Sequence, residues 1–276
     1  MTSDIATTTV SAGGVEIPVL GFGTARMTGD ECRRAVEAAL EVGYRHVDTA
    51  QMYDNERAVG EAIAASDVAR EDVFVVTKVH PDDAAFDDVI ASTRGSLERL
   101  GLSRVDLLLL HAPADPPLEE TLAAMNELQD EGAVDHVGVS NFSVGQLESA
   151  RQLSETPIVT NQVKYHPYHR QDDLLEYCLA HDVCLTAYSP LAEGAVPGDD
   201  RLAEIGEPYG KSAPQVALRW LIQQPNVTAI PKAASRRHIE ANADVFDFEL
   251  SDDAVDAVTG DETGLRNRLD DVLGRE

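Results

Sequence analysis

Residues 105–141 read "VDLLLLHAPADPPLEETLAAMNELQDEGAVDHVGVSN", and this stretch decides the fold. It begins with an unbroken apolar run that ends at His111, continues through an amphipathic helical stretch at 118–132, and finishes with a second apolar run at 136–141. A strand that is apolar on consecutive residues is buried on both faces, which is typical of parallel sheets covered by helices. The stretch therefore predicts a strand, a crossover helix and a parallel strand.

The same alternation runs along the whole chain. The predicted strands are 19–24, 44–49, 73–79, 105–111, 136–141, 158–163, 184–189 and 227–232. The predicted helices are 30–43, 55–66, 86–101, 118–132, 143–154, 172–182 and 213–224. This pattern predicts an α/β fold, a (β/α)8 TIM barrel, whereas an open doubly wound sheet is the competing layout. The pieces 6–10 and 15–19, around the turn cluster 11–14, predict an N-terminal β-hairpin that closes the bottom of the barrel.

The composition restricts the class of partner. The length of 276 residues predicts a single domain, 1–276. The chain has 22 Lys and Arg against 49 Asp and Glu, which gives a net charge of −27. Such a charge repels nucleic acid and anionic lipid, so neither nucleic acid nor a membrane is expected as a partner. Only four of the 22 cations are lysines, and an acidic, lysine-poor surface resembles proteins of halophilic organisms. The three cysteines form no C-x-x-C pair, and no signal peptide is recognised, so we expect a cytoplasmic protein.

Polar and titratable residues end nearly every predicted strand. Because the C-terminal strand ends of a barrel face one common mouth, these side chains are expected to converge there. They are Asp48, Lys78, His111, Ser140, Asn141, Gln162, Tyr188 and Lys232, with Tyr53 in the loop after Asp48. The "GFGTAR" stretch at 21–26 lacks the third glycine of a Rossmann fingerprint.

Several motifs, in order and spread over nearly the whole chain, resemble the aldo-keto reductase family, particularly small cytosolic diketogluconate and methylglyoxal reductases. The motifs are "GFGT" (21–24), "GYRHVDTAQMYDNERAVGEAI" (43–63), "VVTKV" (75–79), "VDLLLLHAP" (105–113), "VGVSNF" (137–142), "NQVKYHP" (161–167), "YSPLAEG" (188–194) and "IPKAASRRHIEAN" (230–242). The resemblance implies a barrel that reduces carbonyls with NAD(P)H. It assigns Tyr53 as the proton donor, Asp48 and Lys78 as the pair beside it, and His111 as the group that orients the substrate carbonyl.

The chemistry of these side chains fits the implied roles. A free tyrosine has a pKa of about 10, which makes it a slow proton donor at neutral pH. A nearby Lys78 ammonium would lower that pKa, Asp48 would hold the ammonium, and His111 would donate a hydrogen bond where negative charge develops. Taken singly, Asp48 could cap a turn, Tyr53 could be a packing residue, and His111 could be a core histidine.

The expected cofactor is NADPH, with NADH as an alternative. By resemblance, Lys232 and Ser235 contact the adenosine 2′-phosphate, and Arg236 and Arg237 could compensate for a neutral His238 where the family often has arginine. Ala233 and Ala241 also depart from the family pattern, and a basic cluster that only caps a helix is the structural alternative. By resemblance again, Ser140, Asn141 and Gln162 bind the nicotinamide carboxamide, Tyr188 stacks on the ring, and Ser189, Leu191 and Ala192 line the pyrophosphate path. Gly23, Thr24 and Asn242 complete the predicted cofactor-binding set.

Together these features predict NADPH-dependent reduction of aldehydes or ketones to alcohols by a monomer. The alternatives are a catalytically weak NADPH-binding regulatory or redox-sensing barrel and a Schiff-base lyase that uses Lys78. No metal is expected, because "HPYH" at 166–169 lacks further ligands. The short 112–117 loop and the polar, acidic tail 260–276 predict a shallow, open pocket for small aldehydes or keto-sugar acids.

Overall fold

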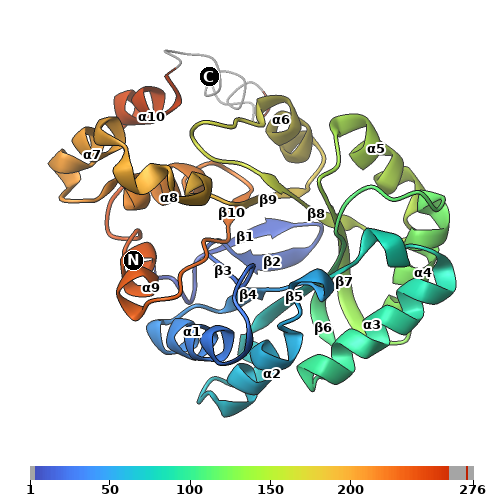
Figure 1. Cartoon of the computed structure of the whole chain (residues 1–276). Helices are drawn as coiled ribbons and strands as arrows, with labels where there is room; N and C mark the ends of the chain where they lie inside the picture. The colour runs from blue at the N-terminus through green and yellow to red at the C-terminus, as the bar shows by residue number, and fades with distance from the viewer. Residues whose placement is uncertain (1–3, 261–271, 273–276) are drawn as a thin grey trace.

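The computed structural model describes residues 4–260 and residue 272. The predicted role of the tail in shaping the substrate pocket therefore falls almost wholly outside the described residues. Within them the chain forms an inner ring of strands surrounded by helices (Figure 1).

Eight parallel strands form the inner ring in the order β10-β9-β8-β7-β6-β5-β4-β3. Their bounds are β3 Phe22–Gly23, β4 His46–Asp48, β5 Phe74–Val79, β6 Val105–Leu110, β7 Val134–Ser140, β8 Ile158–Lys164, β9 Cys184–Tyr188 and β10 Val227–Ala229. A parallel bridge between Leu20 and Ala229, with hydrogen bonds from Gly21 N to Ala229 O and from Ala229 N to Val19 O, joins the last strand to the first. The predicted (β/α)8 barrel is confirmed, because this bridge closes the sheet on itself.

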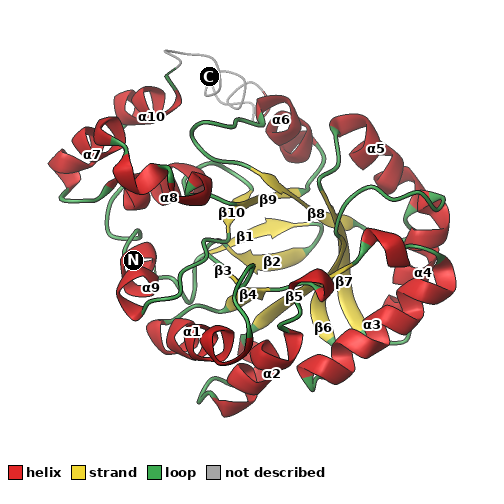
Figure 2. Cartoon of the chain, viewed as in Figure 1, coloured by secondary structure: helices red, strands yellow, loops and turns green. Residues whose placement is uncertain are grey.

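Ten α-helices are described, most of them in an outer ring around the strands (Figure 2). They are α1 Gly29–Val42, α2 Glu56–Ala65, α3 Phe86–Leu100, α4 Leu118–Asp130, α5 Val144–Leu153, α6 Asp172–Ala180, α7 Asp200–Gly206, α8 Ala213–Ile222, α9 Arg236–Ala243 and α10 Asp252–Thr259. The helical stretches identified in the sequence did not include α7 and α10, and α9 was expected only as a short helix at the basic cluster after the last strand; these helices are only seven or eight residues long. Short helices carry too few turns for a clear amphipathic period.

The N-terminal hairpin pairs β1 Thr9–Ala12 with β2 Val15–Pro18. Its turn is shorter than predicted, because Ser11 and Ala12 belong to β1 and only Gly13 and Gly14 form the connection, both with positive φ (58° and 81°). A two-residue hairpin turn of this kind requires φ > 0 at both positions, which glycine adopts without strain.

The hairpin covers the end of the barrel where the strands begin. Ala12 and Ile17 form an apolar cluster with Cys184, the first residue of β9, and with Phe74, the first residue of β5. The hairpin therefore does not cover the opposite end, where the strands finish. That end is formed by the loops that carry the polar strand-end residues. In the part of the chain that the structure describes, no helix is both long and apolar enough to cross a membrane.

Candidate active site

Asp48 and Lys78 form a buried ion pair at the C-terminal ends of β4 and β5. Lys78 Nζ donates to Asp48 Oδ1 at 2.5 Å and to the carbonyl oxygen of Thr49 at 2.7 Å, and the two side chains are almost completely inaccessible to solvent. Burial alone would lower the pKa of Lys78, but the Asp48 carboxylate and the interactions with Asp48 and Tyr53 outweigh burial and raise that pKa above its ordinary value. Lys78 is therefore held as an ammonium ion.

Tyr53 closes a single 3₁₀ turn, Gln51–Tyr53, immediately after β4. Its ring centre lies 5.2 Å from Lys78 Nζ and 5.6 Å from the His111 ring, which it meets edge to face. Burial raises the pKa of the Tyr53 phenol, the Lys78 charge lowers it, and the net result lies above the ordinary value of 10.0. The expectation of a lowered pKa is thus wrong in its net direction, although Lys78 acts in the expected sense; the desolvation of the phenol outweighs it.

His111 follows β6 and lies part-buried beside the Tyr53 ring. Burial and the positive charge of Lys78 lower the pKa of His111 to about 4, so its imidazole is neutral at neutral pH. A neutral imidazole still carries one N–H and can donate one hydrogen bond. The Nδ1 atom of His111 is buried and has no hydrogen-bond partner among the described residues.

These groups surround a cavity of about 290 Å³ at the mouth of the barrel. The cavity is lined by three catalytic candidates, Asp48, Tyr53 and His111, and by the cofactor candidates Gly23, Ser140, Asn141, Gln162, Tyr188, Ser189 and Lys232. Ala25, Pro190 and Ile230, which the sequence did not single out, complete the lining. Lys78 is wholly buried and does not line the cavity itself. It contacts Asp48 and Tyr53, which do.

The predicted carboxamide-binding residues are already linked to one another and to the ion pair. Gln162 Nε2 donates to Asp48 Oδ2 at 2.7 Å, so Gln162 supports the ion pair from β8. Asn141 Nδ2 donates to the His111 carbonyl oxygen at 2.9 Å, and the Tyr188 hydroxyl donates to Asn141 Oδ1 at 2.9 Å. The amide of Asn141 thus ties the end of β6 to the end of β9.

The remaining cofactor candidates do not line this cavity. Thr24 is fully buried, with its hydroxyl donating to the Asp48 carbonyl oxygen at 3.0 Å, and Leu191 packs against the core. Ser235 caps α9, the helix that carries Arg236, His238 and Asn242. The guanidinium of Arg236 is paired with Glu41 at 2.5 Å and Glu240 at 2.8 Å, two contacts that the sequence did not predict.

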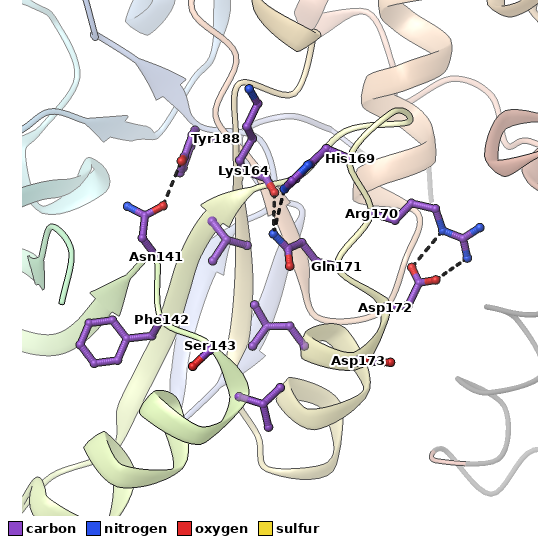
Figure 3. Close-up of a pocket in the computed structure, with 13 residues that line it drawn as sticks. Asn141, Phe142, Ser143, Lys164, His169, Arg170, Gln171, Asp172, Asp173 and Tyr188 are labelled. Atoms are coloured by element: carbon purple, nitrogen blue, oxygen red, sulfur yellow. Dashed lines mark hydrogen bonds and ion pairs between the residues drawn. The ribbon is translucent and has the colours of Figure 1, made fainter.

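A larger cavity of about 680 Å³ lies beside the first and shares Asn141 and Tyr188 with it (Figure 3). Its wall comes from the ends of β7, β8 and β9 and the first residues of α5 and α6, and it carries Lys164, Gln171 and the Arg170–Asp172 ion pair. Figure 3 shows the hydrogen bond between Tyr188 and Asn141 at the border of this cavity.

An ion-pair network crosses the rim of the mouth. Glu193, in the loop after β9, contacts Arg26 of the loop after β3 and Lys164 at the end of β8, each at 3.4 Å. Arg26 and Glu193 both have positive φ (65° and 54°), a conformation that sequence patterns do not reveal for these residue types. No group of three or more His, Cys, Asp or Glu side chains among the described residues is arranged to hold a metal ion.

Comparisons with known proteins agree with the class that this barrel and its tyrosine, lysine, aspartate and histidine define. The model of the aldo/keto reductase family matches residues 19–260, and the chain belongs to this family. It is 40% identical over 253 residues to the glyoxal reductase of Bacillus subtilis (strain 168), covering 90% of this chain and 91% of that protein. The protein is therefore an oxidoreductase that acts on carbonyl groups.

Solved structures agree. A crystal structure described as that of a candidate 2,5-diketo-D-gluconic acid reductase B superposes with a TM-score of 0.90 at 48% identity, covering 91% of this chain and 90% of the other. An aldo-keto reductase of Bombyx mori, solved in complex with NADP, has a TM-score of 0.85 at 32% identity, covering 92% and 93% of the two chains.

Proposed function

We propose that this protein reduces small aldehydes or ketones to alcohols with NADPH, and that Tyr53 donates the proton. The observation that carries the proposal is the contact of one phenol with a buried ammonium on one side and a neutral imidazole on the other, at the edge of a cavity. Few other arrangements of protein groups bring a proton donor, a cation and a hydrogen-bond donor to one point.

Each residue of the site has a distinct role in the proposed reaction. His111, neutral at working pH, donates a hydrogen bond to the substrate carbonyl and orients it. Tyr53 transfers its proton to the oxygen as negative charge develops there. Lys78, fixed by Asp48 and the Thr49 carbonyl, stabilises the phenolate that this transfer leaves behind. The reduced nicotinamide supplies the hydride when it is bound.

The cavity fits a nicotinamide ring in its chemistry. A carboxamide needs both an acceptor and a donor, and Gln162, whose Nε2 is occupied by Asp48, retains its carbonyl oxygen as an acceptor. Tyr188 provides a ring at the wall, and Ser140 and Asn141 add hydroxyl and amide groups. Lys232 at the rim, together with Ser235 and Arg237 beyond it, would receive the phosphate groups, which supports NADPH over NADH.

Substitution of Tyr53 by phenylalanine tests the proposal. We expect the Tyr53→Phe variant to bind NADPH as the unmodified protein does and to lose turnover by about 10²-fold or more, the contribution of a positioned general acid. Tyr177→Phe, which removes a phenol that contacts Arg151 on the outer helices, is the matched control and should keep its rate. Glyoxal is a suitable first substrate because a relative is named for its reduction. Unchanged turnover in Tyr53→Phe would refute the assignment, and NADPH binding without turnover in the unmodified protein would favour the regulatory alternative.

We also propose that the protein works as a monomer in the cytoplasm of a cell with high internal salt. The net charge of −27 is the supporting observation, since at about 1 M salt the Debye length falls to about 3 Å and the self-repulsion of the surface is screened. The free energy of unfolding should therefore rise as KCl is increased. A decrease with KCl would contradict the proposed environment, and light scattering at the same salt concentrations would measure the oligomeric state.

A further inference from the structure

Asn55 lies two residues after Tyr53, at the N-cap of α2, and is 2% exposed. An asparagine at an N-cap ordinarily accepts a hydrogen bond from the backbone of the first helical turn. The Asn55 side chain makes no such capping bond. Its hydrogen bonds are directed to other segments of the chain.

The Asn55 carboxamide joins the loops that follow β3 and β4. Its Nδ2 donates to the carbonyl oxygens of Thr24 and Met27, both at 2.9 Å, and its Oδ1 accepts from the Thr49 hydroxyl at 2.6 Å. One donor group and one acceptor are thus satisfied by three partners inside the protein, which is the condition for burying an amide at low cost.

Two of those partners are bound in turn to the catalytic ion pair. The carbonyl oxygen of Thr49 accepts from Lys78 Nζ at 2.7 Å. The backbone N–H and the hydroxyl of Thr24 both donate to the Asp48 carbonyl oxygen at 3.0 Å. The Asn55 side chain is therefore linked to Asp48 through Thr24 and to Lys78 through Thr49. It lies on the same short segment as Tyr53.

We propose that Asn55 is a positioning residue, whose carboxamide fixes the Tyr53 loop relative to Lys78 by bracing Thr24 and Thr49. The inference rests on the function proposed above. It follows that loss of the carboxamide frees the Thr49 segment, so that the ammonium and the phenol are no longer held at their present separation. A displacement of about 1 Å in a catalytic group can lower a rate by about 10²-fold.

The Asn55→Ala variant tests this role against a matched control. Asn126 is a second buried asparagine, 4% exposed, whose amide braces residues 154–156 and the α4 side chain Gln129 instead of the catalytic loops. Asn126→Ala should lower the melting temperature and leave kcat unchanged. Asn55→Ala should lower kcat by at least about tenfold while KM and the Kd for NADPH stay within about twofold. The solvent deuterium isotope effect on kcat should also increase, because proton donation becomes rate-limiting.

A pair of milder substitutions keeps the test decisive should Asn55→Ala not fold. Thr49→Val removes the hydroxyl that Asn55 Oδ1 accepts from, whereas Thr49→Ser keeps a hydroxyl at that position. We expect Thr49→Val to reproduce the loss of kcat and the larger isotope effect, and Thr49→Ser to recover most of the rate. Unchanged kcat and isotope effect in either Asn55→Ala or Thr49→Val would overturn the inference. Normal turnover in Tyr53→Phe would instead overturn the proposed function, so the two failures are distinguishable.

Discussion

Replacing Lys78 by methionine should separate the electrostatic role of the ammonium from its structural role. Methionine keeps an unbranched chain of similar length and removes the charge. A unit charge at 5.2 Å, the distance of Lys78 Nζ from the Tyr53 ring centre, contributes about 3 kcal/mol at an effective dielectric constant of about 20. Lys78 lowers the pKa of the Tyr53 phenol, so removal of its charge should raise that pKa further above the value that burial already raises.

The rate loss follows from the same interaction. A weaker acid transfers its proton more slowly, and the phenolate left by the transfer would have no cation beside it. Removal of one such preorganised electrostatic group typically costs about 10²–10³-fold in kcat. We therefore expect Lys78→Met to lose kcat within that range for a small aldehyde, with the Kd for NADPH nearly unchanged.

Stability should respond differently from activity. Lys78→Met leaves Asp48 buried, with the Gln162 amide as the one remaining side-chain donor to its carboxylate among the described residues, and breaking a buried pair costs about 3–5 kcal/mol. The double variant, Asp48→Asn with Lys78→Met, removes both charges and should recover most of that free energy without recovering turnover.

The measurements are guanidinium unfolding and steady-state oxidation of NADPH for the unmodified protein, both single variants and the double variant. Retention of kcat within about threefold in Lys78→Met would refute the electrostatic reasoning. Recovery of kcat in the double variant would refute it as well, because the ammonium would then matter only for folding.

Three further outcomes follow from the site and the fold. Burial and Lys78 lower the pKa of His111 to about 4, so its imidazole stays neutral as the pH falls through 6.5. A pH–rate profile should therefore show a change in kcat/KM due to His111 only near pH 4. Gln162→Met removes the donor to Asp48 Oδ2 and should lower the free energy of unfolding by about 1–3 kcal/mol in guanidinium titrations. Gly60→Ala would place a Cβ atom 1.9 Å from the Leu100 carbonyl oxygen, and calorimetry should show destabilisation of about 3 kcal/mol or failure to fold.

The barrel could be predicted from the sequence because its strands are buried on both faces. In the 105–141 stretch the apolar run before His111 became β6 and the helical period became α4, with boundaries within two residues of those predicted. The convergence of Asp48, Tyr53 and His111 on one cavity could likewise be anticipated, since strand order in a barrel places successive C-terminal ends at one mouth. These inferences depend on local periodicity and on topology alone.

Contacts between side chains that are distant in the sequence could not be predicted in this way. Gln162 bonds to Asp48 across 114 positions, and Arg236 pairs with Glu41 across 195. The sequence suggested a carboxamide ligand for the first residue and phosphate compensation by the second. Each residue also has a partner on another element, and only the packed geometry identifies that partner. The net direction of the Tyr53 pKa was missed for a related reason, because desolvation is set by everything that surrounds the ring.

The raised pKa of Tyr53 is consistent with its proposed role as a donor. A proton donor must hold its proton before the reaction, and a phenol whose pKa lies above the ordinary 10.0 is fully protonated at neutral pH. Lys78 then acts mainly on the phenolate, a species that exists only once the proton has left. An interaction that strengthens as the reaction proceeds accelerates it, whereas one that equally stabilises the resting state does not. Burial and the ammonium therefore oppose each other in the resting pKa and serve successive stages of a single proton transfer.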